Sequence, residues 1–186
     1  ADEGLDVEWQ EGDMEALAVA DASFDRVLSS FGAMFASDQR AMAAQLVRAC
    51  RAGGLVGLTA WSVDGLFDRM TTVLMERLPP PPPGSPSPRD WASRELLERI
   101  FAGLPVRLDV DERTVPARFP SPQAALELFE TSAAPIMAAR HALEGADRWE
   151  DTRAALVELF DDAARPDGEG CRFELAYVIV VGEVGP

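Results

Sequence analysis

Short apolar runs alternate with amphipathic stretches along most of the chain. Residues 55–60 are almost wholly apolar, which is typical of a strand covered on both faces of a sheet. Residues 26–30 form an earlier apolar run, and the stretch after Ser37 and Asp38, which offer an N-cap, predicts a helix. The paired glycines at 53–54 predict the left-handed stop of that helix. Strand, helix, glycine turn and strand together indicate half of a doubly wound α/β sheet.

The rest of the chain is predicted to be mainly helical, with a few strands. Residues 64–78 carry apolar side chains at helical spacing, and the proline run at 79–83 ends that amphipathic helix. We expect the proline-rich stretch 79–88 to be a stiff spacer, with a proline-motif ligand as the alternative. Further helices are expected over residues 94–102, 121–129, 133–143 and 147–163, and further strands over residues 7–10, 106–119 and 171–181.

Composition limits the classes of partner. The 186 residues predict one domain with a modest extension, and the hydrophobic share of 47% is ordinary for a globular protein. Seventeen Lys and Arg against 32 Asp and Glu give a net charge of −15, which argues against nucleic acid and anionic membranes as partners. The two cysteines fit no metal spacing, and no signal peptide or membrane-length apolar run is visible, so a cytoplasmic location is expected.

The most informative motif is the acidic turn Gly-Asp-Met-Glu-Ala-Leu at residues 12–17. It follows the predicted strand 7–10, and Ser-Phe-Asp at 23–25 then leads into the second apolar run. The order of the predicted elements and the amino-acid sequence of residues 5–61 resemble the second half of a class I S-adenosylmethionine (SAM)-dependent methyltransferase domain. The nearest group is the ubiquinone/menaquinone-biosynthesis or type-11 group. The resemblance implies a Rossmann-like α/β sheet, mostly parallel with an antiparallel last strand, plus a helical region that caps the acceptor site.

The resemblance also implies a cofactor site for SAM without a metal. Asp13 would accept a hydrogen bond from the adenine amino group, with turn capping as the alternative role of this side chain. Met14 would stack beside the base or offer its backbone N–H, and Ser30 and Phe31 would face the methionine end of the cofactor.

Three departures from the family pattern shape the expectation. Ala18 and Val19 stand where the family usually has Pro and an aromatic residue, and Ala52 stands where it has Pro. The glycine-rich loop of the family would lie roughly fifty residues before Asp13, where only twelve residues precede it here. The resemblance therefore implies an N-terminally truncated sheet that binds SAM weakly or not at all. We expect its bared strand edges and apolar faces to favour a homodimer or higher oligomer.

The expected division has three segments. Residues 1–62 would be the C-terminal half of the SAM-binding core, residues 63–165 a helical acceptor-binding cap with one strand at about 106–118, and residues 166–186 a final strand returning to the core. In the cap region, Trp61, Phe67 and His141 are the candidate acceptor-binding residues, with core packing as the alternative for Trp61. His141 is the single histidine and a weak candidate for a general base, because it lies far from the matched motifs.

Two functions follow as hypotheses. The first is an enzyme that transfers a methyl group from SAM to a small-molecule acceptor. Such transfer needs positioning and desolvation more than a catalytic base. The alternative is a catalytically inactive methyltransferase-like remnant that serves as a binding or oligomerisation module. A strand followed by a glycine-rich loop, encoded in frame upstream, would favour the enzyme.

Overall fold

The computed structural model describes residue 4 and residues 6–144 and 148–186, and within these it contains one five-stranded sheet. The order along the sheet is β1-β2-β5-β3, and β4 pairs with β5 beside this path. The strands are β1 (Phe24–Ser30), β2 (Cys50–Trp61), β3 (Val106–Phe119), β4 (Arg165–Asp167) and β5 (Gly170–Val184).

Helices connect these strands. They are α1 (Gln39–Ala49), α2 (Leu66–Met75), α3 (Arg94–Ile100), α4 (Pro122–Ser132), α5 (Ala134–Glu144) and α6 (Trp149–Ala163), with short 3-10 helices η1 (Ala33–Phe35) and η2 (Pro88–Ala92). Of these, α1, α3 and α4 begin at residues whose polar side chains cap them. The side chain of Asp38 accepts a hydrogen bond from Ala41 N at 2.9 Å, which satisfies one free amide at the start of α1. Ser93 and Ser121 cap α3 and α4 in the same way.

The strand directions confirm the expected fold class. β1 and β2 pair in parallel through the α1 crossover, because a parallel pair cannot be joined by a tight turn. β5 runs antiparallel to β2, β3 and β4, so the last strand is the one that opposes the rest. The chain is therefore a Rossmann-like α/β sheet with an antiparallel final strand, carrying additional helices.

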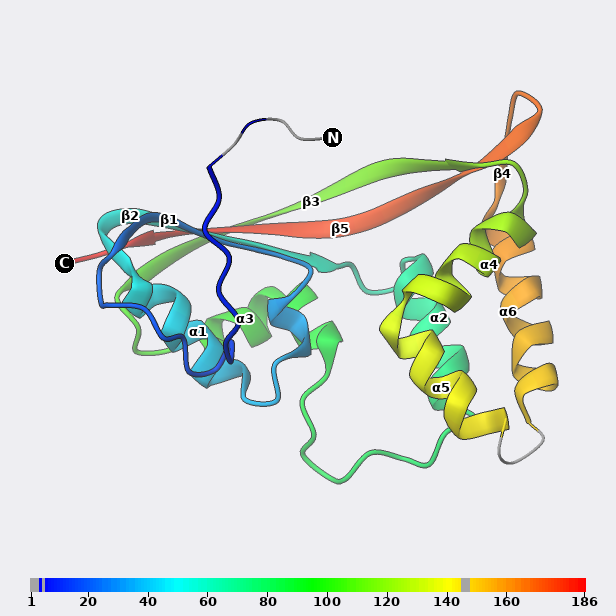
Figure 1. Cartoon of the computed structure of the whole chain (residues 1–186), viewed down its shortest axis with the longest axis horizontal. Helices are drawn as coiled ribbons and strands as arrows, with labels where there is room; N and C mark the ends of the chain where they lie inside the picture. Colours follow the sequence, from blue (N-terminus) through cyan, green and yellow to red (C-terminus); the bar gives the residue numbers. More distant parts are fainter. Residues whose placement is uncertain (1–3, 5, 145–147) are drawn as a thin grey trace.

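One hydrophobic cluster lies between the sheet and the helices α1 and α3. Figure 1 shows both helices on the same face of the sheet, below it in that view. Buried side chains of α1 and α3 pack there against β2 and β5. The buried residues of this cluster include Met42, Leu46, Val56, Leu58, Trp91, Leu97, Val178 and Val180. Burial of this face holds the carboxyl ends of β1 and β2 in fixed positions.

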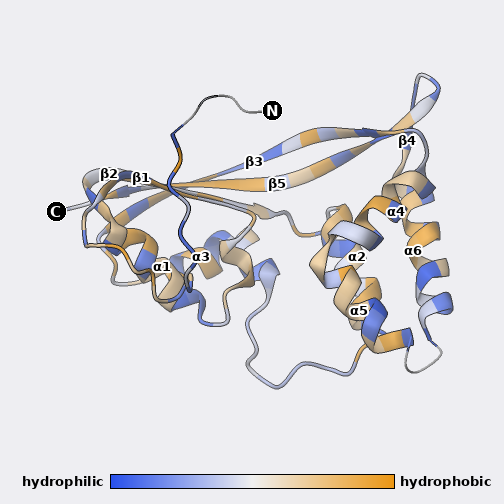
Figure 2. Cartoon of the chain, viewed as in Figure 1, coloured by the Kyte–Doolittle hydropathy of each residue, from blue (hydrophilic) through white to orange (hydrophobic). Residues whose placement is uncertain are grey.

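A second hydrophobic cluster joins α2, α4, α5 and α6 to the far halves of β3 and β5. The two long strands reach from the first cluster to the second (Figure 1), and apolar residues mark the facing sides of the four helices (Figure 2). The buried residues of this cluster include Leu66, Met70, Leu126, Ile136, Leu156, Phe160 and Phe173. The division of the chain into segments 1–62, 63–165 and 166–186 stays a prediction.

Three expectations about the first sixty residues were wrong in detail. Residues 7–10 form no strand; Trp9 is 89% exposed, so the alternation there had no core to face. α1 ends at Ala49 rather than at the paired glycines, because Cys50 already pairs with Phe24 of β1. Gly53 does adopt φ +71°, but within β2, where the pairing shifts register.

β2 was expected to be covered on both faces. In the described chain, buried residues of β2 alternate with half-buried ones from residue 54 onward. Helices α1 and α3 cover one face. The apolar run in residues 55–60 therefore reflects one covered face and one partly open face.

Candidate cofactor and acceptor site

The carboxyl ends of β1 and β2 meet at one edge of the sheet. Ser30 is the last residue of β1 and Trp61 the last of β2, and the two strands run parallel in adjacent positions. Phe31 turns the chain sharply with φ +54°, and its N–H donates to the carbonyl oxygen of Thr59 at 3.2 Å and to the Thr59 hydroxyl at 3.1 Å. The structure thus places two predicted site residues, Ser30 and Phe31, beside a third, Trp61.

An aromatic stack fixes the geometry of this edge. The rings of Phe31 and Trp61 stack with centroids 3.9 Å apart, and Trp61 stacks on Phe67 of α2 at 4.0 Å. Phe67 in turn meets the edge of Phe129 at 5.2 Å, which extends the contact into the second cluster. Trp61 therefore packs on both sides, and it also lines a cavity, so packing and pocket wall are compatible roles for it.

The acidic turn is tied to the segment that follows β1. One carboxylate oxygen of Asp13, Oδ1, accepts from Glu15 N at 2.8 Å, which is the turn-capping role. Glu15 Oε1 accepts from Ser37 N at 2.5 Å and from Asp38 N at 2.9 Å, just before α1 begins. Asp13 and Met14 are thereby held near the chain that leaves β1, with Met14 37% exposed.

Arg48 of α1 anchors the loop that follows the acidic turn. Its guanidinium donates to the carbonyl oxygens of Leu17 and Val19, each at 2.8 Å, and pairs with Asp21 at 2.5 Å. Arg48 was not singled out from the sequence. The signal that was missed is a long basic side chain facing a loop rich in unpaired carbonyls.

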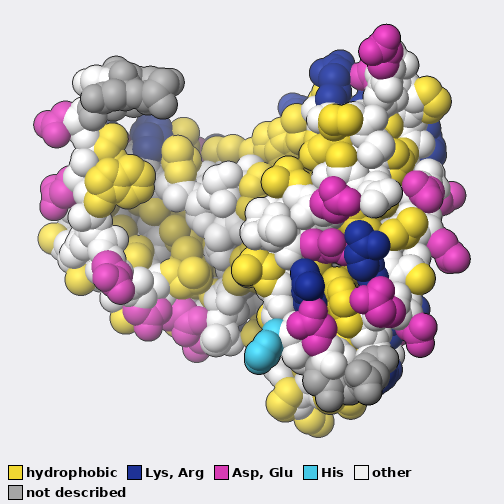
Figure 3. Space-filling view, turned by 45° about the vertical axis from the view of Figure 1, so that its right-hand side comes forward, with side chains coloured by type: hydrophobic (Ala, Val, Ile, Leu, Met, Phe, Trp, Pro, Cys, Tyr) yellow, Lys and Arg dark blue, Asp and Glu magenta, His cyan; other side chains and the backbone are white. Residues whose placement is uncertain are grey.

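A cavity of about 670 Å³ opens beside this edge, between the sheet and the helical part. Figure 3 shows a hollow between these two parts of the molecule, with hydrophobic side chains in it. Its walls come from the loop after β1, the end of β2, α2, η2 and the start of α5. The lining residues are Met34, Phe35, Trp61, Phe67, Asp68, Met70, Thr71, Met75, Pro88, Arg89, Ala133, Ala134 and Pro135.

Two charged residues of this lining form an ion pair. The carboxylate of Asp68 is buried, with its residue 7% exposed, and its Oδ1 lies 2.8 Å from Arg89 Nε. The other oxygen, Oδ2, accepts from Asp64 N at 2.8 Å near the start of α2. Sequence reasoning missed both residues, since Asp68 sits on an amphipathic helix and Arg89 follows the proline-rich stretch.

The predicted acceptor residues do not all come together. Trp61 and Phe67 both line the cavity, and their binding of an acceptor stays a prediction. His141 lies in α5 with an exposed side chain, and it is absent from the described lining of the cavity. The site therefore contains two of the three candidates, and the whole of it is at the carboxyl edge of the strands, where open α/β sheets bind ligands.

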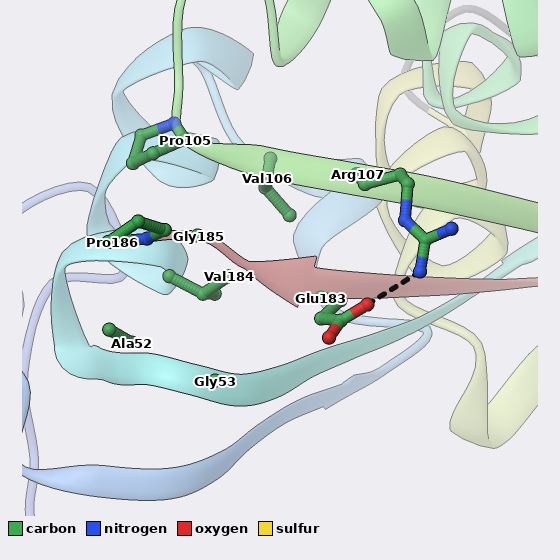
Figure 4. A pocket seen from close by; sticks show the side chains of 9 residues that line it. All are labelled: Ala52, Gly53, Pro105, Val106, Arg107, Glu183, Val184, Gly185 and Pro186. Atoms are coloured by element: carbon green, nitrogen blue, oxygen red, sulfur yellow. Dashed lines mark hydrogen bonds and ion pairs between the residues drawn. The ribbon is translucent and has the colours of Figure 1, made fainter.

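A second cavity, of about 640 Å³, lies at the opposite end of the strands (Figure 4). It is lined by the beginnings of β2 and β3 and the end of β5. Its two charged side chains, Arg107 and Glu183, pair with each other at 2.6 Å. With both charges engaged, it offers little to recognise a ligand and is a poor candidate site.

Other chemical features of the described residues indicate no further candidate site. Within them, no group of three or more metal-ligating side chains could hold an ion, and no helix has the length and apolarity to cross a bilayer. Cys50 and Cys171 are unpaired and buried, and burial raises the pKa of both thiols. A raised thiol pKa lowers the thiolate fraction, so these are inert packing residues.

Comparison with known proteins agrees with this geometry. A family model described as "Methyltransferase domain" matches residues 1–58. The chain is 31% identical over 185 residues to the uncharacterized protein Rv1405c of Mycobacterium tuberculosis, covering 98% of this chain and 66% of that protein. It is 33% identical over 98 residues to the uncharacterized protein Rv1403c of the same organism, covering 53% of this chain and 36% of that one.

Solved structures show the same fold. The YcgJ protein from Bacillus subtilis matches with a TM-score of 0.56 at 17% identity, over 95% of this chain and 70% of YcgJ. A putative methyltransferase from Bacillus halodurans matches with a TM-score of 0.53 at 13% identity, over 97% of this chain and 78% of its own. Residues 1–58 therefore belong to the methyltransferase-domain family, and the chain as a whole has the Rossmann-like fold of these solved methyltransferase-like structures.

Proposed function

We propose that this protein transfers a methyl group from SAM to a small-molecule acceptor. One observation carries the proposal: an apolar cavity opens directly beside the carboxyl ends of β1 and β2. Trp61 links the strand ends to the cavity, because it ends β2, stacks on Phe31 and lines the cavity. An acceptor held in the cavity would therefore be next to a cofactor held at the strand ends.

The residues of the acidic turn and of the strand end at Ser30 fit SAM chemically. Asp13 uses one oxygen to cap its turn, and its Oδ2 accepts from none of the described residues, so it can accept from the adenine amino group. Met14 is partly exposed beside it, and Ser30 and Phe31 would lie toward the methionine end. When bound, SAM would supply a methyl group on a sulfonium: a lone pair of the acceptor would bond to the methyl carbon as the carbon–sulfur bond breaks, leaving S-adenosylhomocysteine as the neutral thioether.

The acceptor side provides positioning and exclusion of water. Trp61 and Phe67 present flat apolar surfaces, and Met34, Met70 and Met75 line the same cavity with adaptable thioethers. Removing water strengthens the attack of a nucleophile on a sulfonium, and such a site needs no dedicated base. We assign no step to His141, because its exposed side chain is outside this lining.

Titration calorimetry of the full-length protein with SAM tests the cofactor assignment. Asp13→Ala removes a charge-assisted hydrogen bond of about 1.5–3 kcal/mol, so the dissociation constant should rise by roughly tenfold or more. Asp6→Ala, at an exposed position of the same segment, is the matched control and should leave the affinity unchanged. Equal affinities of Asp13→Ala and the parent protein, with the fold intact by circular dichroism, would remove Asp13 from the site.

The acidic composition and the buried thiols support two further parts of the proposal. A net charge of −15 repels phosphate backbones, which supports a small molecule rather than a nucleic acid as acceptor. Two unpaired cysteines fit a reducing compartment, which supports the cytoplasm as the place of action.

A binding or oligomerisation module is the second candidate function. The observation in its favour is β1, which among the described strands pairs on one side only and carries Leu28 at 76% exposure. Open edges pair with other chains, so a homodimer through β1 is the form this candidate takes. Sedimentation of the full-length protein as a monomer at micromolar concentration would eliminate it, whereas a dimer without methyl transfer would favour it.

A further inference from the structure

We propose that the acceptor is an apolar organic molecule carrying one carboxylate, and that Arg89 receives this carboxylate in the cavity beside Trp61. The inference deepens the proposed function and rests on it, since it names the chemical class of the molecule bound there. Neither the family match nor the resemblance assigns a role to Arg89.

The cavity has a nearly uniform lining with a single cation. Of its thirteen described lining residues, only Asp68, Thr71 and Arg89 carry polar side chains. Six of the others are large and apolar: Met34, Phe35, Trp61, Phe67, Met70 and Met75. A volume of about 670 Å³ lies within the range of sites for drug-sized ligands, which are mostly apolar with a few placed polar groups.

One oxygen of Asp68 accepts a hydrogen bond, and the other is in ion-pair contact with Arg89 without a hydrogen bond of normal geometry. Oδ1 pairs with Arg89 Nε at 2.8 Å, and Oδ2 accepts from Asp64 N at 2.8 Å. Because Asp68 is buried and paired, it is a poor partner for a ligand and a good anchor for the arginine. The ion pair also joins α2 to η2, and so fixes where the Arg89 head group stands.

Arg89 is the group left to recognise a ligand. Its side chain is 51% exposed, and its two Nη atoms donate to none of the described residues. A guanidinium has only donors and pairs with a carboxylate through two parallel N–H···O bonds. An arginine held through Nε thus leaves its Nη side for an anionic oxygen, while Asp68 balances the guanidinium charge when the cavity is empty.

Charge and polarity together select the ligand class. A cationic ligand would face the guanidinium, and a fully apolar ligand would cover its Nη groups without offering them an acceptor. A highly charged ligand would have to be desolvated against the apolar walls. A ligand with a hydrophobic body and one carboxylate contacts the apolar walls with its body and the Arg89 guanidinium with its carboxylate.

A matched pair of probes tests this inference without methyl transfer. We would titrate the full-length protein, with and without excess S-adenosylhomocysteine, with 1-naphthaleneacetate and with its neutral isostere 1-naphthaleneacetamide. The carboxylate should bind about tenfold more tightly than the amide, because a hydrogen bond to a charged group is stronger than a neutral one. Equal binding of the two probes, or binding of neither, would overturn the inference.

Variants then assign the preference to Arg89. Arg89→Gln should abolish the tenfold preference while retaining binding of the amide. Because this change leaves Asp68 buried without its partner, the double variant Asp68→Asn with Arg89→Gln provides a second version in which no charge is stranded. It should also bind both probes equally. Arg113→Gln, a similarly exposed arginine paired with Asp111 on β3, should keep the full preference.

The outcomes separate this inference from the proposed function. A carboxylate preference that persists in Arg89→Gln and in the double variant rejects Arg89 and leaves methyl transfer standing. If the preference depends on Arg89 but the protein neither binds SAM nor transfers a methyl group, the ligand class stands and the methyltransferase function falls.

Discussion

Trp61 is the residue whose replacement tests the site geometry most sharply. In the change Trp61→Leu, the stack between Phe31 and Phe67 loses its middle ring, so two ring pairs with centroids 3.9 and 4.0 Å apart disappear. Aromatic pairs contribute about 0.5–1.5 kcal/mol each beyond the area they bury, so the free energy of unfolding should fall by about 1–3 kcal/mol.

The assay is urea unfolding followed by far-ultraviolet circular dichroism. Trp9→Leu is the control, because the same chemical change occurs at a side chain that is 89% exposed, and its effect should stay within about 0.5 kcal/mol. The slope with urea should be unchanged in both variants, which shows that the unfolding reaction is the same. Equal midpoints for Trp61→Leu and Trp9→Leu would refute the stack as a structural element of the site.

Three further predictions follow from particular contacts. Gly54→Ala should destabilise the fold by at least 1 kcal/mol in urea unfolding, since an added Cβ would lie 2.8 Å from two backbone oxygens, whereas Gly12→Ala meets nothing within 4 Å and should be neutral. Arg48→Met should speed hydrogen exchange in the loop 17–23, because three hydrogen bonds to it are lost; unchanged exchange would contradict that anchor. A hydrogen bond from Arg69 lowers the pKa of Asp162. The contribution of this pair to stability is therefore present above about pH 4 and is lost as pH falls through the lowered pKa. Asp162→Asn should weaken the dependence of the urea midpoint on acid pH, and an identical dependence in variant and parent would contradict this.

Sequence alone predicted the elements whose signals are local. The N-cap at Asp38, the proline run after α2 and the β-branched final strand each act within a few residues, and the corresponding elements are present in the structure. The predicted strand 7–10 failed because alternation over four residues specifies a strand only when a neighbouring surface can bury one face. The end of α1 was misplaced because pairing of Cys50 with β1, a tertiary interaction, overrode the glycine signal.

The candidate site shows the same division between local and long-range information. Trp61 and Phe67 are candidates because the resemblance places the acceptor pocket in this region of the chain, and both line the cavity. The pairing of Asp68 with Arg89 joins residues 21 positions apart, across a stretch predicted only to be a spacer. The periodicity of apolar residues along the sequence cannot predict such a contact, because the contact depends on where the proline-rich stretch returns the chain.

The most direct test of the central claim is a crystal structure of the full-length protein with S-adenosylhomocysteine. The account predicts the adenine amino group within hydrogen-bonding distance of the Asp13 carboxylate. It also predicts the thioether sulfur at the carboxyl ends of β1 and β2, facing the cavity lined by Trp61 and Phe67. A ligand bound elsewhere, or with its sulfur turned away from that cavity, would contradict the account.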